Sequence, residues 1–236
     1  MVLITMAGNG SRFWQAGYSE IKYLLMLGEL NLFQRSLLTF KELFNNDLFV
    51  FVYRPTHTDE ATLRRFCKEI GLDRELVFVP LLEETSGQAE TAYKAISLLP
   101  ATKDQPLMIF NIDTFYQNIQ SHVALYKKKQ SFIDLFCEKG SHWSFACLDE
   151  NNEVTRVAEK IRISDYCSTG MYGFSDIPTF QKAFLDCSFT DVSEKFVMPM
   201  YNLLIGNTVV VGNVLSRDSV FVSGTPDEYE FLLESF

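Results

Sequence analysis

Short apolar runs alternate with helical patterns through the first half of this chain, and this alternation restricts the fold more than any other feature. The runs have the length of buried strands and lie at Val2–Met6, Leu48–Tyr53, Leu76–Val79 and Leu107–Ile112. Strands that alternate with helices are typical of a parallel sheet with helices on both faces. We therefore predict an α/β protein of three layers, α/β/α, with a mixed and mostly parallel central sheet.

Capping signals place helices between these strands and at the end of the chain. Asn31 is followed three residues later by Gln34, which is the spacing of a capping box. The expected helices cover 31–44, 58–70 (with Thr58 as the cap) and 85–99. A second capping box, formed by Thr225 and Glu228 around Pro226, predicts the last helix.

The pattern changes from residue 132 onward to hairpin-like strands. We expect strands at 132–137, 143–148, 154–159, 168–174 and 208–211, and helices at 177–185 and 193–204. A turn at 149–152 joins two of these strands, which suggests antiparallel additions to the parallel core. No repeat or linker interrupts the sequence, so we expect a single domain over 1–236.

Composition excludes several classes of protein. The 236 residues contain 30 acidic and 21 basic side chains, and a net charge of −9 lacks the basic face of a nucleic-acid binder. Any anionic ligand must therefore meet a local cluster of cations. No apolar run approaches the roughly 20 residues of a membrane helix, and the N-terminus is typical of a buried strand, so we expect a cytoplasmic protein that binds no membrane. The five scattered cysteines and three scattered histidines indicate neither disulfides nor zinc.

The loop after the first predicted strand is the segment most suggestive of chemistry. It contains Gly8, Gly10 and Arg12, and Lys22 follows ten residues later. Glycines let the backbone approach a ligand, and two cations near one loop suit a triphosphate. The loop is neither a Walker A motif nor a dinucleotide-binding fingerprint. The alternative is a tight strand exit with surface cations.

This segment resembles the signature of the sugar-phosphate nucleotidyltransferases, also called sugar-nucleotide pyrophosphorylases. Residues 6–13 match its beginning, and Lys22 matches its lysine, although Ile21 replaces the usual proline. The resemblance continues in order along the chain, at 87–92, 111–113, 157–160, 168–172 and 224–227. It implies a Rossmann-like fold of the nucleotide-diphospho-sugar transferase type.

The resemblance also implies roles for individual residues. Arg12 and Lys22 would be catalytic, and Ala7, Gly8, Gly10 and Gln88 would bind the nucleotide. Asp113 would hold Mg²⁺, and Glu159, Lys160 and Gly170 would bind the acceptor.

Three of these positions also have structural interpretations from the residues alone. Asp113 follows a buried strand, where ligands bind in open α/β sheets, but it could cap a turn. Gln88 could read a nucleobase edge or cap a helix. Gly170 could admit substrate or mark a bulge.

The implied reaction transfers a nucleotidyl group from an NTP to a phosphorylated small molecule, a sugar 1-phosphate, and releases pyrophosphate. The nucleotide-binding half would cover about 1–115 and the acceptor half 116–236. Small relatives suggest a role in surface-polysaccharide precursors, including capsule polysaccharide, and the chain end leaves no room for a C-terminal β-helix domain. The sequence leaves the oligomeric state open, homo-oligomer included.

One family feature is missing. The second metal-binding aspartate of many relatives aligns with Val222. Either Asp113, phosphates and water alone hold the ion, or another acid such as Asp218 or Asp227 replaces the missing ligand. Three alternatives therefore stay open: a cytidylyltransferase for a phosphocholine-like acceptor, a glycosyltransferase of related fold, and a non-catalytic nucleotide-sugar binding protein.

Overall fold

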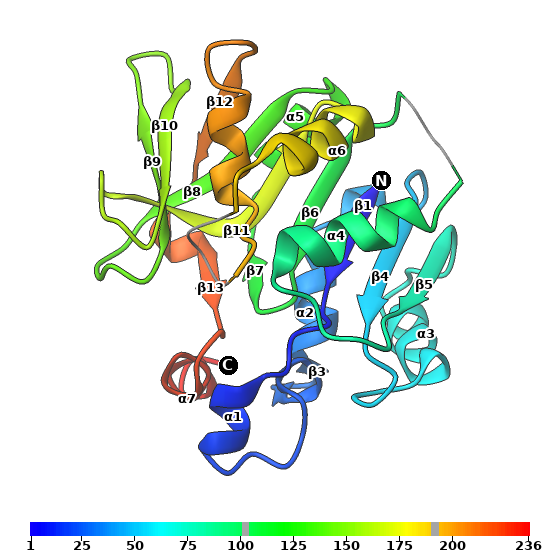
Figure 1. Ribbon diagram of the computed structural model, residues 1–236. Coiled ribbons are helices and arrows are strands. Elements are labelled where there is room, and N and C mark those ends of the chain that lie inside the picture. The colour runs from blue at the N-terminus through cyan, green and yellow to red at the C-terminus, as the bar shows by residue number, and fades with distance from the viewer. Residues whose placement is uncertain (101–103, 190–193) are drawn as a thin grey trace.

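A computed structural model describes residues 1–100, 104–189 and 194–236, and it is built around a nine-stranded mixed sheet (Figure 1). The sheet order is β10-β9-β11-β6-β1-β4-β5, and β8 and β12 extend it from β11. Its strands are β1 (Val2–Thr5), β4 (Phe49–Tyr53), β5 (Leu76–Pro80), β6 (Leu107–Asn111), β8 (Ser131–Cys137), β9 (Ser144–Leu148), β10 (Val154–Glu159), β11 (Tyr166–Phe174) and β12 (Val210–Val214). Two small sheets pair β2 (Met26–Leu27) with β3 (Leu30–Asn31) and β7 (Thr114–Tyr116) with β13 (Val220–Val222).

The helices cover both faces of the sheet. They are α1 (Ser11–Gln15), α2 (Leu32–Leu38), α3 (Glu60–Glu69), α4 (Gln88–Ser97), α5 (Ser121–Lys127), α6 (Ile177–Asp186) and α7 (Pro226–Leu233). Short 3₁₀ turns lie at Lys22–Leu24, Lys41–Leu43, Met198–Leu203 and Arg217–Ser219. Among the described residues, none of the helices has the length and apolar character that crossing a membrane requires.

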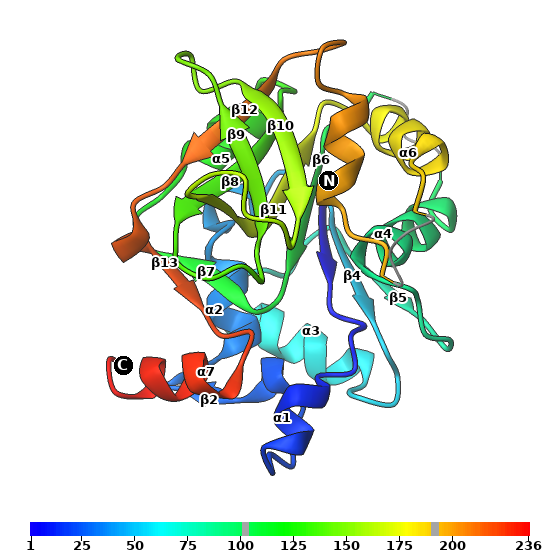
Figure 2. The ribbon, with the colours of Figure 1, turned by 60° about the vertical axis from the view of Figure 1, so that its left-hand side comes forward.

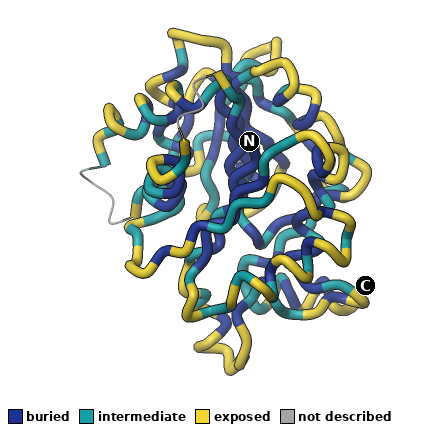
Figure 3. The backbone as a smooth tube through the Cα atoms, turned by 90° about the vertical axis from the view of Figure 1, so that its right-hand side faces the viewer, coloured by how far each residue is buried: buried dark blue, intermediate teal, exposed yellow. Residues whose placement is uncertain are grey.

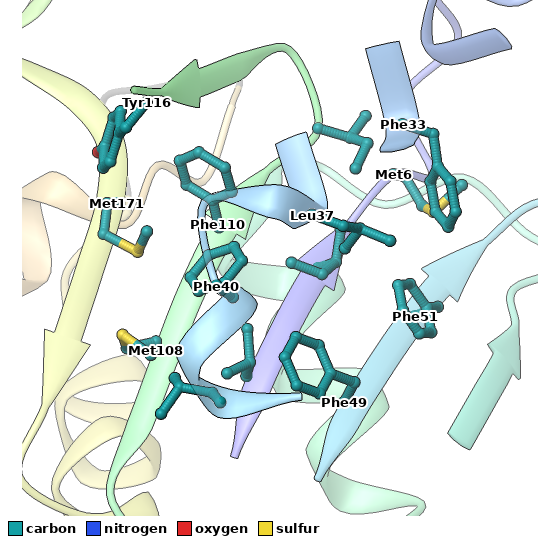
Figure 4. Close-up of a cluster of buried hydrophobic side chains, with 14 of the residues drawn as sticks. Met6, Phe33, Leu37, Phe40, Phe49, Phe51, Met108, Phe110, Tyr116 and Met171 are labelled. Carbon is teal, nitrogen blue, oxygen red and sulfur yellow. The ribbon is translucent and has the colours of Figure 1, made fainter. Parts of the chain in front are cut away.

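The parallel part of the sheet is buried on both sides, as its continuous apolar runs predict. Alternate residues of β4 face opposite layers: Phe49 and Phe51 join the core beneath α2, α3 and α5, whereas Val50 and Val52 join the core beneath α4 and α6. Figure 4 shows the first of these cores, with Phe33 of α2 packed against Phe51, and Phe40, which follows α2, packed edge-on against Phe49 and Phe110. Figure 3 shows the same arrangement as buried strands inside exposed loops. The predicted three-layer α/β fold with its mixed, mostly parallel sheet is confirmed.

Strand direction decides where a ligand can bind. β1 is parallel to β4 and β6, and β4 is parallel to β5, so the carboxyl ends of all four strands lie at one edge. α1 and α7 lie together below this edge, where Phe13 packs against Tyr229 (Figure 2). The loops after these four strands therefore meet in one place.

Several predicted boundaries differ from the structure. The helix predicted to reach residue 44 ends at Leu38, because the Thr39 carbonyl bonds to His122 Nε2 (3.2 Å) rather than to a later amide of the helix. The Thr39 hydroxyl also accepts from the Tyr116 amide (3.0 Å). The cap of α3 is Asp59 rather than Thr58, since the Asp59 carboxylate accepts from the Thr62 amide (2.9 Å). Both predicted capping boxes, at Asn31 and Thr225, are confirmed.

Larger differences lie in the second half of the chain. α4 begins at Gln88, later than predicted, because the preceding residues bond to a distant segment described below. The helix predicted at 193–204 is only a 3₁₀ turn, Met198–Leu203, and its start at Ser193 lies outside the described residues. β8 pairs with β11 and β12 rather than forming a hairpin with β9, and the sequence patterns missed β7 and β13.

Candidate active site

A cavity of about 680 Å³ opens at the carboxyl ends of the parallel strands and continues toward β10 and β11. Every site residue predicted from the sequence lines it: Ala7, Gly8, Gly10, Arg12, Lys22, Gln88, Asp113, Glu159, Lys160 and Gly170. The expected cluster of cations is present, but carboxylates lie among the cations. The wall carries four basic side chains and five acidic ones: Arg12, Lys22, Arg54 and Lys160, and Glu84, Asp113, Glu159, Glu194 and Glu228.

The glycine loop joins β1 directly to α1. Gly10 takes a left-handed conformation (φ 63°), which favours glycine, and precedes the first turn of α1. Arg12 in that turn is exposed, and within the described part of the chain its side chain has no hydrogen bond or ion pair. Its guanidinium is therefore available to an anion in the cavity.

Asp113 lies just beyond β6 and forms an ion pair with Lys22. The main chain around Asp113 is fixed, because its carbonyl accepts from the Ser223 amide (2.8 Å). Its second carboxylate oxygen, Oδ1, is buried without a hydrogen-bond partner among the described residues. A buried carboxylate oxygen without a donor is a suitable ligand for a hard cation such as Mg²⁺.

The position that aligns with the missing aspartate, Val222, is on β13 and pairs with Thr114. Asp218 and Asp227 line a neighbouring cavity rather than this one. Glu228 is the other carboxylate beside Gly224: a Cβ added there would lie 3.4 Å from Asp113 Oδ2 and 3.5 Å from Glu228 Oε2, and this Glu228 oxygen accepts from the Thr225 amide (2.9 Å). No set of three or more metal-ligating side chains occurs in the described ranges, so a Mg²⁺ ion here would depend on these two carboxylates and on substrate oxygens.

Gln88 is the first residue of α4, and its amide donates to Thr5 Oγ1 at the end of β1 (3.1 Å). Its side chain therefore contacts the sheet and does not cap the helix. Gly87 before it has φ 144°, and an added Cβ would lie 2.5 Å from the Lys195 carbonyl oxygen. The Lys195 main chain holds this loop, donating to the Ser86 carbonyl (2.5 Å) and accepting from the Ala89 amide (3.0 Å).

Glu159 and Lys160 lie at the end of β10, at the opposite side of the cavity. Burial raises the pKa of Glu159, and the Ser144 hydroxyl donates a hydrogen bond to it. Lys160 Nζ is 3.7 Å from Glu194 and lies 4.4 Å from the centre of the Phe196 ring. The pair is thus held by neighbouring side chains rather than projecting freely.

Gly170 lies at a bulge in β11 and lets the side chain of Asn111 lie close to the main chain. The pairing of β11 with β8 shifts register between Ser168 and Tyr172, and Gly170 has φ 91°. An added Cβ would lie 2.3 Å from the side-chain amide of Asn111. Asn111 Oδ1 is buried and without a partner among the residues described.

Other residues of the cavity wall escaped the sequence analysis, among them Arg54, Glu84, Trp143, Glu194 and Phe196. They belong to no local motif and come from four separate segments of the chain. Only the packing of distant segments brings them together, so no local sequence signal marked them.

The chain resembles known proteins of solved structure over 99% of its length. No family model matches the chain, and no curated protein matches it in sequence. A nucleoside-diphosphate-sugar pyrophosphorylase from Vibrio cholerae RC9 is 29% identical, with a TM-score of 0.88 over 99% of this chain and 100% of that one.

Two less similar structures share the fold. A putative glucose-1-phosphate thymidylyltransferase from Bacillus anthracis is 15% identical (TM-score 0.77, over 99% of this chain and 94% of that one). A UDP-glucose pyrophosphorylase is 13% identical (TM-score 0.76, over 99% and 97%). The chain is thus similar over its whole length to a sugar-nucleotide pyrophosphorylase, and it shares the fold of two further enzymes described as nucleotidyltransferases or pyrophosphorylases.

Proposed function

We propose that this protein transfers a nucleoside monophosphate from an NTP to a sugar 1-phosphate, or to a similar phosphorylated small molecule, and releases pyrophosphate. The observation that carries the proposal is the convergence of Arg12, Lys22, Asp113 and Lys160 on one cavity at the carboxyl edge of the sheet. The nucleotide would occupy the side formed by residues 1–115, and the acceptor the side formed by 116–236. We also propose that the protein acts in the cytoplasm, as its N-terminus and short apolar runs suggest, and in the synthesis of surface-polysaccharide precursors, as the sequence resemblance implies.

The proposed reaction needs alignment and charge neutralisation rather than a base. An acceptor phosphate is already an anion at neutral pH, so its oxygen can attack the α-phosphorus in line. Arg12 would stabilise the negative charge that develops on the leaving pyrophosphate, and Lys22 would contact phosphate oxygens beside Asp113. Gln88 would orient the base, while Glu159 and Lys160 would position the acceptor's hydroxyls and phosphate.

The donor set at Asp113 fits a magnesium ion. The unpartnered Asp113 Oδ1 and the nearby Glu228 carboxylate are oxygen ligands of the kind that Mg²⁺ prefers, and phosphates and water complete such sites. When bound, the ion would supply positive charge against the phosphates of the NTP.

The decisive experiment measures pyrophosphate release with a panel of ATP, GTP, CTP, UTP and dTTP against several sugar 1-phosphates and phosphocholine. We expect one combination to release pyrophosphate at the rate of an enzyme. Tight nucleotide binding without release would instead favour a binding protein, and release of a nucleoside diphosphate from a nucleotide sugar would favour a glycosyltransferase.

Removing Arg12 tests the catalytic assignment. Arg12→Ala should lower kcat by about 10²–10³-fold, which is the typical loss when one transition-state donor is removed. Arg74→Ala is the matched control, because Arg74 is exposed on the surface and away from the cavity. An Arg12→Ala enzyme with nearly normal turnover would refute the assignment.

The acceptor side also supports phosphocholine as a second candidate acceptor. Trp143, Tyr172 and Phe196 line this side together with Glu159 and Glu194. Aromatic faces and carboxylates attract a quaternary ammonium group. Higher kcat/KM for phosphocholine than for any sugar 1-phosphate would decide for this acceptor.

A further inference from the structure

Three polar side chains from separate strand ends form a closed cluster at the nucleotide side of the cavity. Arg54 Nη1 donates to Asn9 Oδ1 (2.6 Å) and to Glu84 Oε1 (3.1 Å). Asn9 Nδ2 donates to the same Glu84 oxygen (2.9 Å). All three residues line the cavity.

The sheet brings these residues together. Asn9 lies beyond β1, Arg54 directly follows β4, and Glu84 lies beyond β5, and these three strands are parallel neighbours in the sheet. Loops at the carboxyl ends of adjacent parallel strands share one edge, so residues 9, 54 and 84 meet although the sequence separates them widely.

Arg54 is the buried member of the cluster. Its side chain is 15% exposed, whereas that of Glu84 is 67% exposed. Its Nε is buried and has no hydrogen-bond partner in the described part of the chain. Hydrogen bonds from Asn9 and Arg54, with the charge of Arg54, lower the pKa of Glu84, so this carboxylate stays ionised at neutral pH. A guanidinium withdrawn from water needs such a partner.

The cluster fixes the glycine loop. Asn9 stands between Gly8 and Gly10, and its carbonyl oxygen accepts a hydrogen bond from Trp14 Nε1 (2.8 Å). Glycines on both sides give the main chain wide conformational freedom. The contacts of Arg54 with the Asn9 side chain and of Trp14 with its main chain restrict that freedom next to Arg12.

We propose that Arg54 is a positioning residue for the nucleoside triphosphate: through Asn9 it holds the glycine loop in the conformation that receives the phosphates, and it adds positive charge to this side of the cavity. This inference rests on the proposed nucleotide-binding function. Glu84 serves the same purpose from the solvent side by keeping Arg54 in place.

The test is isothermal titration of the full-length protein with ATP, GTP, CTP, UTP and dTTP, each with MgCl₂ and without an acceptor. For the nucleotide that the wild type binds best, Arg54→Gln should raise Kd at least tenfold. Arg54→Lys should stay within about threefold of wild type, because a lysine keeps the charge and can donate to Asn9. Arg74→Gln is the matched control and should leave Kd unchanged.

Glu84→Gln provides a second approach from the exposed side of the cluster, in case Arg54→Gln fails to fold. It should raise the Kd for the NTP about two- to fivefold. It should also change the fluorescence of Trp14, which is measured in a Trp143→Phe background so that Trp14 is the remaining tryptophan. In turnover, the KM for NTP should rise in both variants while the KM for the acceptor stays constant.

The outcomes separate this inference from the proposed function. If the wild type binds none of the five nucleotides, both are wrong. If it binds one and Arg54→Gln binds equally tightly, only the role of Arg54 is wrong. Equal rises in the KM values for NTP and acceptor would also refute it, since they would indicate a general structural defect.

Discussion

Asp134 is the most unusual ionisable residue of the core. It lies on β8, fully buried, where Asn213 donates to Oδ1 (2.7 Å) and His122 Nδ1 lies 3.9 Å from Oδ2. Burial raises the pKa of Asp134 from 3.8 to about 7 and lowers the pKa of His122 from 6.5 to about 4. Between about pH 4 and pH 7 the folded protein therefore buries a proton on Asp134 and an uncharged imidazole beside it.

This pKa shift makes stability depend on pH. The unfolded carboxyl loses its proton near pH 3.8 and the folded one near pH 7, so the wild type loses stability as pH rises through this window. Asp134→Asn has no such proton, and its free energy of unfolding relative to wild type should rise with pH by up to about 1.4 kcal/mol per unit. Urea unfolding of both proteins at several pH values between 4 and 8 measures the difference, in which the contribution of His122 largely cancels. A constant difference would contradict the buried proton.

At the level of elements, one segment joins the two sides of the cavity. The main chain of Lys195 bonds to Ser86 and Ala89 on the proposed nucleotide side, and its neighbours Glu194 and Phe196 contact Lys160 on the proposed acceptor side. Val197 and Met198, which follow, are buried in the core beneath α4 and α6. The segment is therefore anchored to the core at one end while it spans the cavity wall.

This contact requires a glycine at position 87. A Cβ there would lie 2.5–2.9 Å from main-chain atoms of Lys195, and φ is 144°. Gly87→Ala should lower the free energy of unfolding by about 2–4 kcal/mol, because both strain and displacement of the segment contribute. Gly206→Ala is the matched control: its φ is also positive, at 83°, but no described atom lies within 4 Å of the added Cβ. Its loss should be about 1 kcal/mol. Equal losses in urea unfolding would show that the contact with Lys195 is unimportant.

At the scale of the whole molecule, charge makes nucleotide binding depend on a divalent cation. The protein carries a net charge of −9, and five carboxylates face four basic side chains at the described cavity wall. A free triphosphate is itself strongly negative, so the proposed Mg²⁺ would remove much of the repulsion. EDTA should raise the Kd for the preferred NTP at least tenfold in isothermal titration.

The matched variant is Asp113→Asn, which removes one cavity carboxylate. It should bind the NTP without metal at least as tightly as the wild type does, and EDTA should affect it much less. Equal affinity of the wild type with and without EDTA would contradict the magnesium proposal.

The sequence by itself determined the elements whose signals are local. The apolar runs predicted β1, β4, β5 and β6, because strands buried on both faces must be apolar throughout. The capping boxes at Asn31 and Thr225 were also correct, since a capping residue and its partner are only three positions apart. The motifs along the chain likewise indicated ten residues that lie at the cavity wall, although not the other residues that line it.

Helix ends and cavity contacts that depend on residues distant in the sequence were decided only by the tertiary structure. α2 ends where the Thr39 carbonyl bonds to His122, and α4 begins late because Lys195 holds the loop before it. In the same way, Glu228 and Asp113 both lie beside Gly224 and Arg54 holds Asn9, although no spacing in the chain relates these residues. The physical reason is that the parallel sheet collects its strand ends at one edge, and the contacts made there are fixed by three-dimensional packing rather than by sequence separation.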